Sequence, residues 1–311
     1  MPDADAVQLL QHAAANGVTF WDTAEVYKCK ADDGASTIYN EVVVGKALAA
    51  VGRERVQIAT KYMPKIHGSS MTSDTVIAAC VASCQRLGVE YVDLYYVHRI
   101  HPTVPVEEQA MAMKSVLDRG LAKHIGVSEF SAENLRRFHE VCPVTAVQQE
   151  WSLVNRDLED KIVPACRDLG IGIVAYSPLC RSLLSGAIRT ASDLSGGDAD
   201  LRPQRYPRFS AENLPKNSSL VHAVKNLASS RSLSAAQLSL AWVAGQGLDV
   251  VPIPGTTKIE HLMENIASQE VDLTKEEIDL IAASVPVDKV SGDRYAGGAD
   301  ALTFRDQGVN A

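Results

Sequence analysis

The stretch Tyr91-Val92-Asp93-Leu94-Tyr95-Tyr96-Val97-His98-Arg99 decides the fold class of this chain of 311 residues. Apart from Asp93, residues 92–97 are largely apolar, which is typical of a strand that is buried on both faces of a parallel sheet. His98 and Arg99 follow at the point where the apolar run stops. Such a strand predicts an α/β protein, in which helices cover both faces of the sheet.

Short β-branched runs alternate with longer amphipathic segments on both sides of this stretch. Strands are expected at residues 18–21, 56–60, 92–97, 124–127, 146–149, 172–176 and 250–253. Helices are expected at residues 4–16, 41–50, 73–87 (with Ser73 as N-cap), 106–119, from the N-cap Ser131 onward, 159–168, 219–229, 234–246, 258–267 and 275–283. Strand–helix alternation implies parallel pairing with right-handed crossovers. We therefore predict one (β/α)₈ barrel domain over residues 1–311.

The pattern contains seven strands, whereas a (β/α)₈ barrel requires eight. The chain begins on what looks like the first helix, so we expect the first strand and an N-terminal hairpin before it to be absent. Two strand edges would then lie open, and open edges invite aggregation. Either Met1 is an internal start, or the chain is a natural short form with impaired catalysis.

Composition and charge exclude several classes of protein. A formal net charge of −8 disfavours nucleic acid as a partner, because an acidic surface repels phosphates. No apolar run is long enough to span a membrane, and the start lacks the features of a signal peptide. Six cysteines without a CxxC pair predict free thiols in a reducing compartment, which favours the cytoplasm. His98 and His101 lack a third ligand, so we expect no metal site.

Ionisable side chains stand at the carboxyl ends of three consecutive predicted strands, where barrels place their catalytic groups. These are Asp22, Lys61 and His98, and Tyr27 lies in the loop after Asp22. Hydride addition to a carbonyl creates an alkoxide that needs a proton donor. A phenol beside an ammonium suits that role, because the ammonium favours the phenolate. Each residue alone is more often structural, but together they predict carbonyl reduction, with Lys61 held by Asp22 and the substrate oxygen oriented by His98.

Several segments resemble the aldo-keto reductases, and they occur in the order of that family. They are residues 17–27, 40–41 with 45–48, 91–99, 126–128, 175–179 and 253–258. The resemblance runs from about residue 6 to about residue 295, and its details are similar to the branch of plant auxin-induced-type and pyridoxal reductases. It implies an NADPH-dependent reductase of small carbonyl compounds, in which Asp22, Tyr27, Lys61 and His98 form the catalytic tetrad and Tyr27 is the general acid.

The resemblance also implies a set of residues that bind NADP(H). Ser128 and Gln148 match residues that bind the nicotinamide carboxamide, and Tyr176 matches the ring that stacks on the nicotinamide. Ser177, Leu179 and Arg181 match residues at the pyrophosphate, Gly255, Thr256, Thr257 and Lys258 match the loop at the adenosine 2′-phosphate, and Glu264 and Asn265 match the adenine contacts. A lysine beside hydroxyls at a helix N-terminus suits an anion, which favours NADP over NAD.

The sequence departs from the family pattern at three places. Glu129 replaces the Asn that follows Ser128 in many members, and residues 28–39 form an insertion expected at the pocket rim. His261 stands where other branches carry an Arg, and a neutral imidazole would hold the 2′-phosphate less well. We also expect Trp151 and residues 28–33 to form pocket walls.

Two other functions remain open. The potassium-channel β subunits share this fold and bind NADP while serving mainly as partners, so the chain is alternatively an NADP-binding regulatory protein. The other alternative is a catalytically impaired, truncated form.

Overall fold

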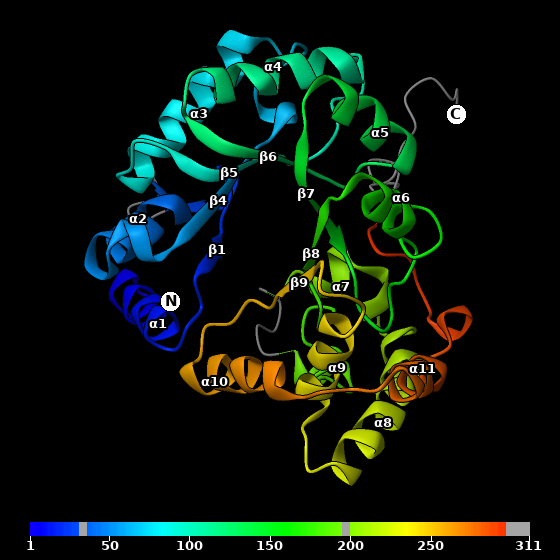
Figure 1. Cartoon of the computed structure of the whole chain (residues 1–311). Helices are drawn as coiled ribbons and strands as arrows, with labels where there is room; N and C mark the ends of the chain where they lie inside the picture. The colour runs from blue at the N-terminus through cyan, green and yellow to red at the C-terminus, as the bar shows by residue number, and fades with distance from the viewer. Residues whose placement is uncertain (31–35, 195–199, 297–311) are drawn as a thin grey trace.

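The computed structural model describes residues 1–30, 36–194 and 200–296, and its centre is a curved sheet of seven parallel strands. The order in the sheet is β1-β4-β5-β6-β7-β8-β9, and every neighbouring pair is parallel. The strands are β1 (Phe20–Asp22), β4 (Gln57–Tyr62), β5 (Val92–Val97), β6 (Ala122–Ser128), β7 (Val144–Glu150), β8 (Gly172–Tyr176) and β9 (Val250–Ile253). Figure 1 shows the strands curving around one axis as an incomplete (β/α) barrel, as the sequence predicts.

Helices surround the sheet and connect its strands (Figure 1). They are α1 (Asp3–Ala15), α2 (Asn40–Val51), α3 (Ser73–Leu87), α4 (Val106–Asp118), α5 (Ala132–Val141), α6 (Ile162–Leu169), α7 (Arg202–Arg205), α8 (Leu214–Ser230), α9 (Ala235–Ala244), α10 (Ile259–Ala267) and α11 (Lys275–Ser284). Ser131 caps α5 as predicted, since its Oγ accepts a hydrogen bond from the N–H of Asn134 at 3.1 Å. The N-cap of α3 is Thr72 rather than Ser73, because the Thr72 side chain accepts the N–H of Thr75.

Two groups of apolar side chains form the core. The larger one lies between strands and helices. The smaller one fills the interior of the sheet and consists of the strand residues Ala59, Leu94, Tyr96, Ala146 and Val174. Because side chains alternate between the faces of a strand, residues two positions further along each strand point to the same interior. The interior face therefore continues toward the carboxyl ends of the strands, where the predicted site residues stand.

The sheet does not close on itself within the described residues. β1 and β9 are its two edges, and each pairs with a strand on one side only. Strands β2 (Lys28–Lys30) and β3 (Thr37–Tyr39) form a separate antiparallel hairpin after β1 that the sequence did not predict. Part of the insertion, residues 31–35, lies outside the described residues.

Two further features bear on earlier expectations. All six cysteines are free, as predicted, and Cys29 on β2 is the exposed one. Among the described helices, none combines the length and apolar character that crossing a bilayer would need.

Candidate active site

The interior face of the barrel ends in a layer of polar side chains. Asp22 and Lys61 stand two positions beyond the core residues Phe20 and Ala59, and therefore point to the same interior. The Lys61 ammonium donates to the Asp22 carboxylate and, at 2.8 Å, to the carbonyl oxygen of Thr23. The Lys61 side chain is fully buried and that of Asp22 is 9% exposed. Burial makes this contact strong, because little water screens the two charges.

Gln148 extends the layer across the barrel, since its side chain stands two positions beyond Ala146 on β7. Its Nε2 donates to the second carboxylate oxygen of Asp22 at 2.8 Å. Asp22 therefore binds Lys61 with one oxygen and Gln148 with the other. This arrangement fixes the orientation of the carboxylate.

Tyr27 and His98 complete the cluster. The ammonium of Lys61 lies 5.3 Å from the centroid of the Tyr27 ring. The ring of Tyr27 meets that of His98 edge to face, with 6.0 Å between centroids. Tyr27 is 44% exposed, whereas His98 is 8% exposed. The structure thus brings together the four residues of the predicted tetrad.

The environment of His98 favours its neutral form. Burial lowers the pKa of His98 well below its ordinary value, and the nearby charges of Lys61 and Arg99 lower it further. Its backbone N–H donates to the carbonyl oxygen of Tyr62 at 2.8 Å. Its Nδ1 is buried and has no hydrogen-bond partner among the described residues. A neutral imidazole at neutral pH has one N–H to donate to a substrate oxygen.

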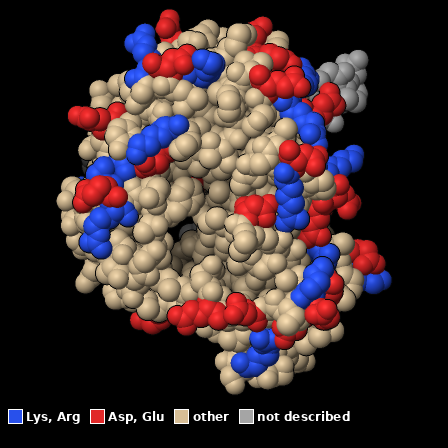
Figure 2. Space-filling model, in the orientation of Figure 1, with Lys and Arg blue, Asp and Glu red and all other residues tan. Residues whose placement is uncertain are grey.

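A cavity of about 990 Å³ extends from this cluster toward the open side of the sheet. Figure 2 shows a hollow in the middle of the molecule whose visible rim is mostly uncharged. Nine of the predicted cofactor residues line the cavity together with Asp22, Tyr27 and His98; the nine are Ser128, Gln148, Tyr176, Ser177, Leu179, Arg181, Gly255, Thr256 and Asn265. Such a volume is large enough for a dinucleotide, since drug-sized ligands occupy roughly 300–1,000 Å³.

Of the remaining predicted cofactor residues, Thr257 and Lys258 directly precede α10 and Glu264 lies within it. Thr257 and Lys258 are exposed, Glu264 is half-buried, and none of the three lines the cavity. The backbone N–H of Lys258 donates to the Oγ1 of Thr256 at 3.1 Å. Lys258 is the N-cap of α10, so this residue stands at the positive end of the helix dipole.

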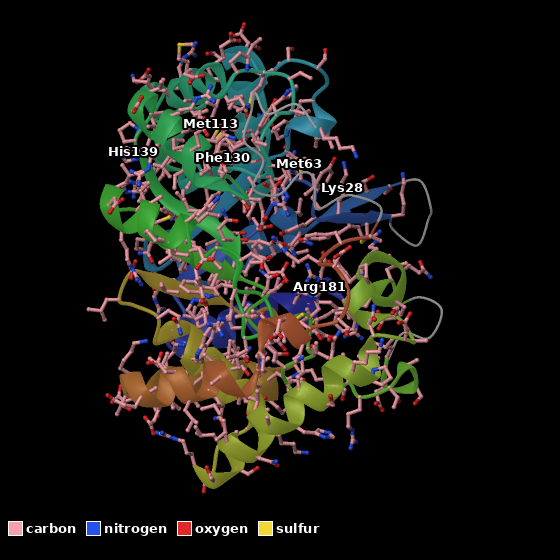
Figure 3. The ribbon with its side chains drawn as sticks, turned by 90° about the vertical axis from the view of Figure 1, so that its right-hand side faces the viewer. Lys28, Met63, Met113, Phe130, His139 and Arg181 are labelled. Carbon is pink, nitrogen blue, oxygen red and sulfur yellow. The ribbon has the colours of Figure 1, made fainter. Side chains whose placement is uncertain are left out.

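The loops after the strands lie toward one end of the barrel. Lys28, Met63 and Arg181 follow β1, β4 and β8, and Figure 3 shows all three toward that end, with His139 on the opposite side. The turn after β8 contains several non-glycine residues with positive φ, including Ser177 (48°) and Arg181 (52°). Strained backbone of this kind clusters at functional sites.

Sequence comparison identifies the family of this chain. A profile of the Aldo/keto reductase family matches residues 1–285. The chain belongs to the aldo-keto reductase family. A relative from Glycine max, "Probable aldo-keto reductase 1", is 42% identical over 318 residues, which cover 98% of this chain and 86% of that protein.

Solved structures of other family members share the fold. A thermostable aldo-keto reductase, Tm1743, crystallised with the inhibitor epalrestat, gives a TM-score of 0.72 at 29% identity over 91% of this chain and 88% of its own. An aldo-keto reductase from Klebsiella pneumoniae in complex with NADPH gives 0.70 at 26% identity, over 91% of this chain and 86% of its own.

Some residues that line the cavity of this aldo-keto reductase were not predicted. Arg99 lines the cavity and donates to the Oγ of Ser128 at 3.2 Å and to the carbonyl oxygen of His98 at 2.7 Å. Tyr206 and Tyr295 line the cavity near Arg181. Arg99 was visible in the quoted stretch beside His98, whereas the two tyrosines carried no local signal.

The prediction of which residues form the pocket walls of this reductase is wrong in part. Trp151 is buried in the core, and its Nε1 donates to Glu159 at 3.0 Å, so it does not line the cavity. Lys28, on the hairpin, does not line the cavity either, and residues 31–33 lie outside the described part of the chain.

Proposed function

We propose that this chain is an NADPH-dependent reductase that converts a small aldehyde or ketone to an alcohol, with Tyr27 as the proton donor. One observation carries the proposal: Asp22, Lys61, His98 and Tyr27 meet at one end of a cavity whose walls contain most of the expected cofactor residues. We also propose that residues 1–311 act as one domain, and that the chain belongs to the plant branch of the family, which the 42% identity with the Glycine max relative supports. Six free thiols are consistent with the cytoplasm.

The residues of the cavity fit the proposed cofactor. Tyr176 offers a half-buried ring for stacking, while the side chains of Ser128 and Gln148 face the cavity with polar groups suited to an amide. Lys258 at the start of α10 offers a cation for a phosphate. NADPH bound there would supply the hydride that the carbonyl carbon accepts.

The chain's own residues then account for the proton. The hydroxyl of Tyr27 donates its proton to the substrate oxygen as negative charge develops there, and the phenolate that remains is stabilised by the Lys61 ammonium. Asp22 keeps Lys61 in place. His98, neutral in this environment, donates a hydrogen bond that orients the same oxygen.

The test is NADPH oxidation with 4-nitrobenzaldehyde, followed at 340 nm with Tyr27→Phe alongside. We expect turnover in the natural chain and a loss of about 10²–10⁴-fold in Tyr27→Phe, with NADPH affinity retained. NADPH binding without turnover would favour the regulatory alternative. The same assay tests whether seven strands suffice, since an eighth strand would fill the gap between β1 and β9.

A further inference from the structure

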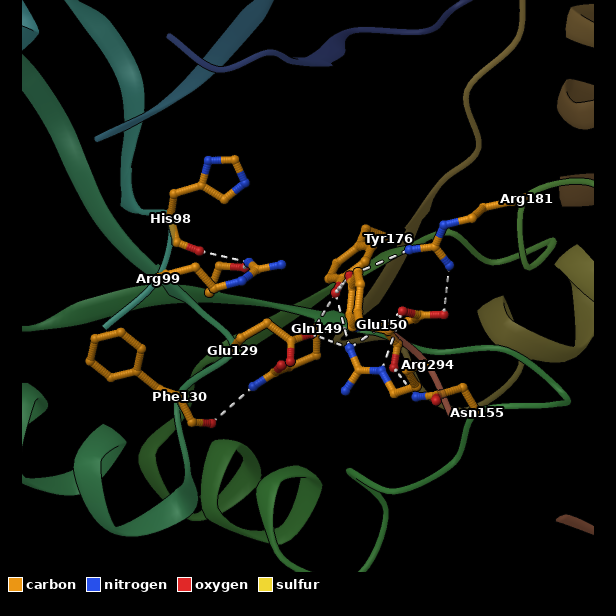
Figure 4. Close-up of polar contacts among 12 residues, drawn as sticks. His98, Arg99, Glu129, Phe130, Gln149, Glu150, Asn155, Tyr176, Arg181 and Arg294 are labelled. Carbon is orange, nitrogen blue, oxygen red and sulfur yellow. Dashed lines mark hydrogen bonds and ion pairs between the residues drawn. The ribbon is translucent and has the colours of Figure 1, made fainter. Parts of the chain in front are cut away.

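A buried network of charges meets at the hydroxyl of Tyr176 (Figure 4). Glu129 follows β6 and Glu150 ends β7, and both carboxylates are fully buried. Arg294, near the end of the described chain, is 5% exposed. Its Nη2 lies 2.8 Å from Glu129 Oε1 and 3.3 Å from Glu150 Oε2. One guanidinium therefore joins the ends of two neighbouring strands.

The hydroxyl of Tyr176 is bound within this network. It donates to Glu129 Oε1 at 2.7 Å, and it accepts a hydrogen bond from Arg294 Nη2 at 3.0 Å. The hydroxyl of Tyr295 lies 3.0 Å from the Tyr176 hydroxyl. Three side chains thus hold one phenol, and two of them are adjacent residues of the C-terminal segment.

The network pairs each buried carboxylate with a guanidinium. The second guanidinium belongs to Arg181, which pairs with Glu150 at 3.2 Å and donates to the Tyr295 hydroxyl at 3.3 Å. The guanidinium carbon of Arg181 also lies 3.9 Å from the centroid of the Tyr206 ring. Two carboxylates therefore face two guanidiniums. Burial opposes the charge of Arg294, but Glu129, Tyr176 and Glu150 outweigh that effect and raise its pKa, so it stays ionised.

The segment that carries Arg294 follows a fixed path. The N–H and C=O of Ser291 both bond to the Asn217 side chain, at 2.8 and 2.9 Å. Gly292 has φ +86°, and a Cβ there would lie 2.9 Å from the backbone nitrogen of Arg208. The N–H of Ala296 donates to the carbonyl oxygen of Arg205 at 3.0 Å. Contacts on both sides therefore deliver the two side chains to the network.

The backbone of Glu129 points to the same conclusion. Its φ is 59°, a left-handed conformation that non-glycine residues rarely adopt. Strain of this kind persists only where the surroundings over-determine the residue. Here Arg294 and Tyr176 hold the carboxylate. The replacement of the family's Asn by Glu129 thus has a structural partner in Arg294.

We propose that Arg294 and Tyr295 are positioning residues, which fix the Tyr176 ring in the orientation that stacks on the nicotinamide. The inference rests on the proposed function. In the segment 291–296, Arg294 donates hydrogen bonds to Glu129 and to the Tyr176 hydroxyl. Tyr295 contacts the Tyr176 hydroxyl and itself lines the cavity. Without them, the ring rotates more freely and the cofactor binds less tightly.

The experiment compares NADPH dissociation constants, measured by fluorescence titration, with melting temperatures for four variants. They are Tyr295→Phe, Arg294→Lys, Tyr176→Phe and the double variant Tyr176→Phe/Tyr295→Phe. Tyr295→Phe removes one hydroxyl and keeps the ring beside Arg181 and Tyr206. A matched control is Arg53→Lys. Arg53 forms an ion pair with the partly buried Asp93, with 2.7 Å between Nη2 and Oδ2, and this pair lies at the opposite end of the barrel.

We expect Tyr295→Phe to raise the dissociation constant several-fold, because it removes one hydroxyl and its two contacts. Arg294→Lys should raise it about tenfold or more, because it disturbs several charged hydrogen bonds at once. The control leaves it unchanged. If Tyr295 acts through Tyr176, adding Tyr295→Phe to Tyr176→Phe has little further effect, since coupled residues are non-additive. The KM for the aldehyde should change less than the NADPH constant.

Two results would overturn the inference. The first is wild-type NADPH affinity in Tyr295→Phe and Arg294→Lys together with lowered melting temperatures, which would make the network purely structural. The second is additive effects of Tyr295→Phe and Tyr176→Phe. If Arg294→Lys does not fold, Tyr295→Phe alone and the comparison of the single and double variants of Tyr176 and Tyr295 still test the inference. Failure of the natural chain to bind NADPH would instead overturn the proposed function, and this inference with it.

Discussion

The ring of Tyr27 stands edge to face against the ring of His98, with 6.0 Å between the centroids and 87° between the planes. Edge-to-face contact is a favoured geometry for aromatic rings. Tyr27 comes from a loop and is 44% exposed, whereas His98 is nearly buried at the end of β5. The exposed ring therefore packs against a buried neighbour, and both residues line the cavity.

Acid should destabilise the protein through His98. Its pKa is lowered in the folded state, chiefly by burial, so the unfolded chain binds more protons as pH falls below about 6.5. The stabilisation is present above that pH and is lost as pH falls toward the lowered pKa. We expect the melting temperature to fall more between pH 7.5 and pH 5 in the natural chain than in His98→Gln. Parallel curves for the two proteins would contradict this.

Removing the Lys61 ammonium should leave the Asp22 carboxylate buried without its ion-pair partner. Breaking a buried pair in this way costs roughly 3–5 kcal/mol. We expect Lys61→Met to lower the free energy of unfolding by about that amount in urea titrations. The double variant Asp22→Asn/Lys61→Met should recover much of the loss, because it removes both charges. A double variant as unstable as the sum of the single ones would refute the pairing argument.

Lys258 should distinguish the two nicotinamide cofactors. If its ammonium contacts the 2′-phosphate, Lys258→Met raises the dissociation constant for NADPH about tenfold or more, as expected for a charged hydrogen bond, and leaves that for NADH unchanged. Lys275→Met is the matched control, since Lys275 pairs with Asp279 on α11 at 2.6 Å. Equal losses of affinity for NADPH and NADH would show that Lys258 does not contact the phosphate.

Gly126 on β6 has no room for a side chain. An added Cβ would lie 2.4 Å from two carbons of the Tyr96 ring and 2.9 Å from the carbonyl oxygen of Ala146. Overpacking of this kind costs about 1–3 kcal/mol, so Gly126→Ala should lower the melting temperature. The centroid of the Tyr96 ring lies 5.8 Å from the Lys61 ammonium. A shift of this ring should therefore disturb Lys61, and turnover should fall as well. Gly172→Ala is the control, because its Cβ would meet only ordinary van der Waals contacts. Equal destabilisation of the Gly126 and Gly172 variants would argue against the clash at Gly126.

The sequence predicted those parts of the fold that depend on local patterns. β5, β8 and β9 begin and end where their apolar runs do, since buried strands are marked by continuous apolar residues. The meeting of Asp22, Lys61 and His98 was predicted for the same reason, because each directly ends or follows such a strand. Their chemical roles stay a prediction.

Other parts had no local signal. The strand Lys28–Lys30 is exposed along its length, so neither an apolar run nor an alternating pattern marks it. The two carboxylate partners of Arg294 lie 144 and 165 residues away in the chain, and only the fold brings them together. Thr72 and Ser73 are both good N-caps by residue type, and only the backbone path selects Thr72.

The distribution of the cysteines makes the protein convenient to label. Five of the six are buried, and burial raises the pKa of Cys142 to about 11 and that of Cys166 to about 12, which suppresses their reactive thiolates. Cys29 is exposed and lies two residues after Tyr27. A maleimide dye applied to the native protein near neutral pH would therefore attach at one position, on the hairpin that follows Tyr27, and would place a single probe two residues from the proposed proton donor.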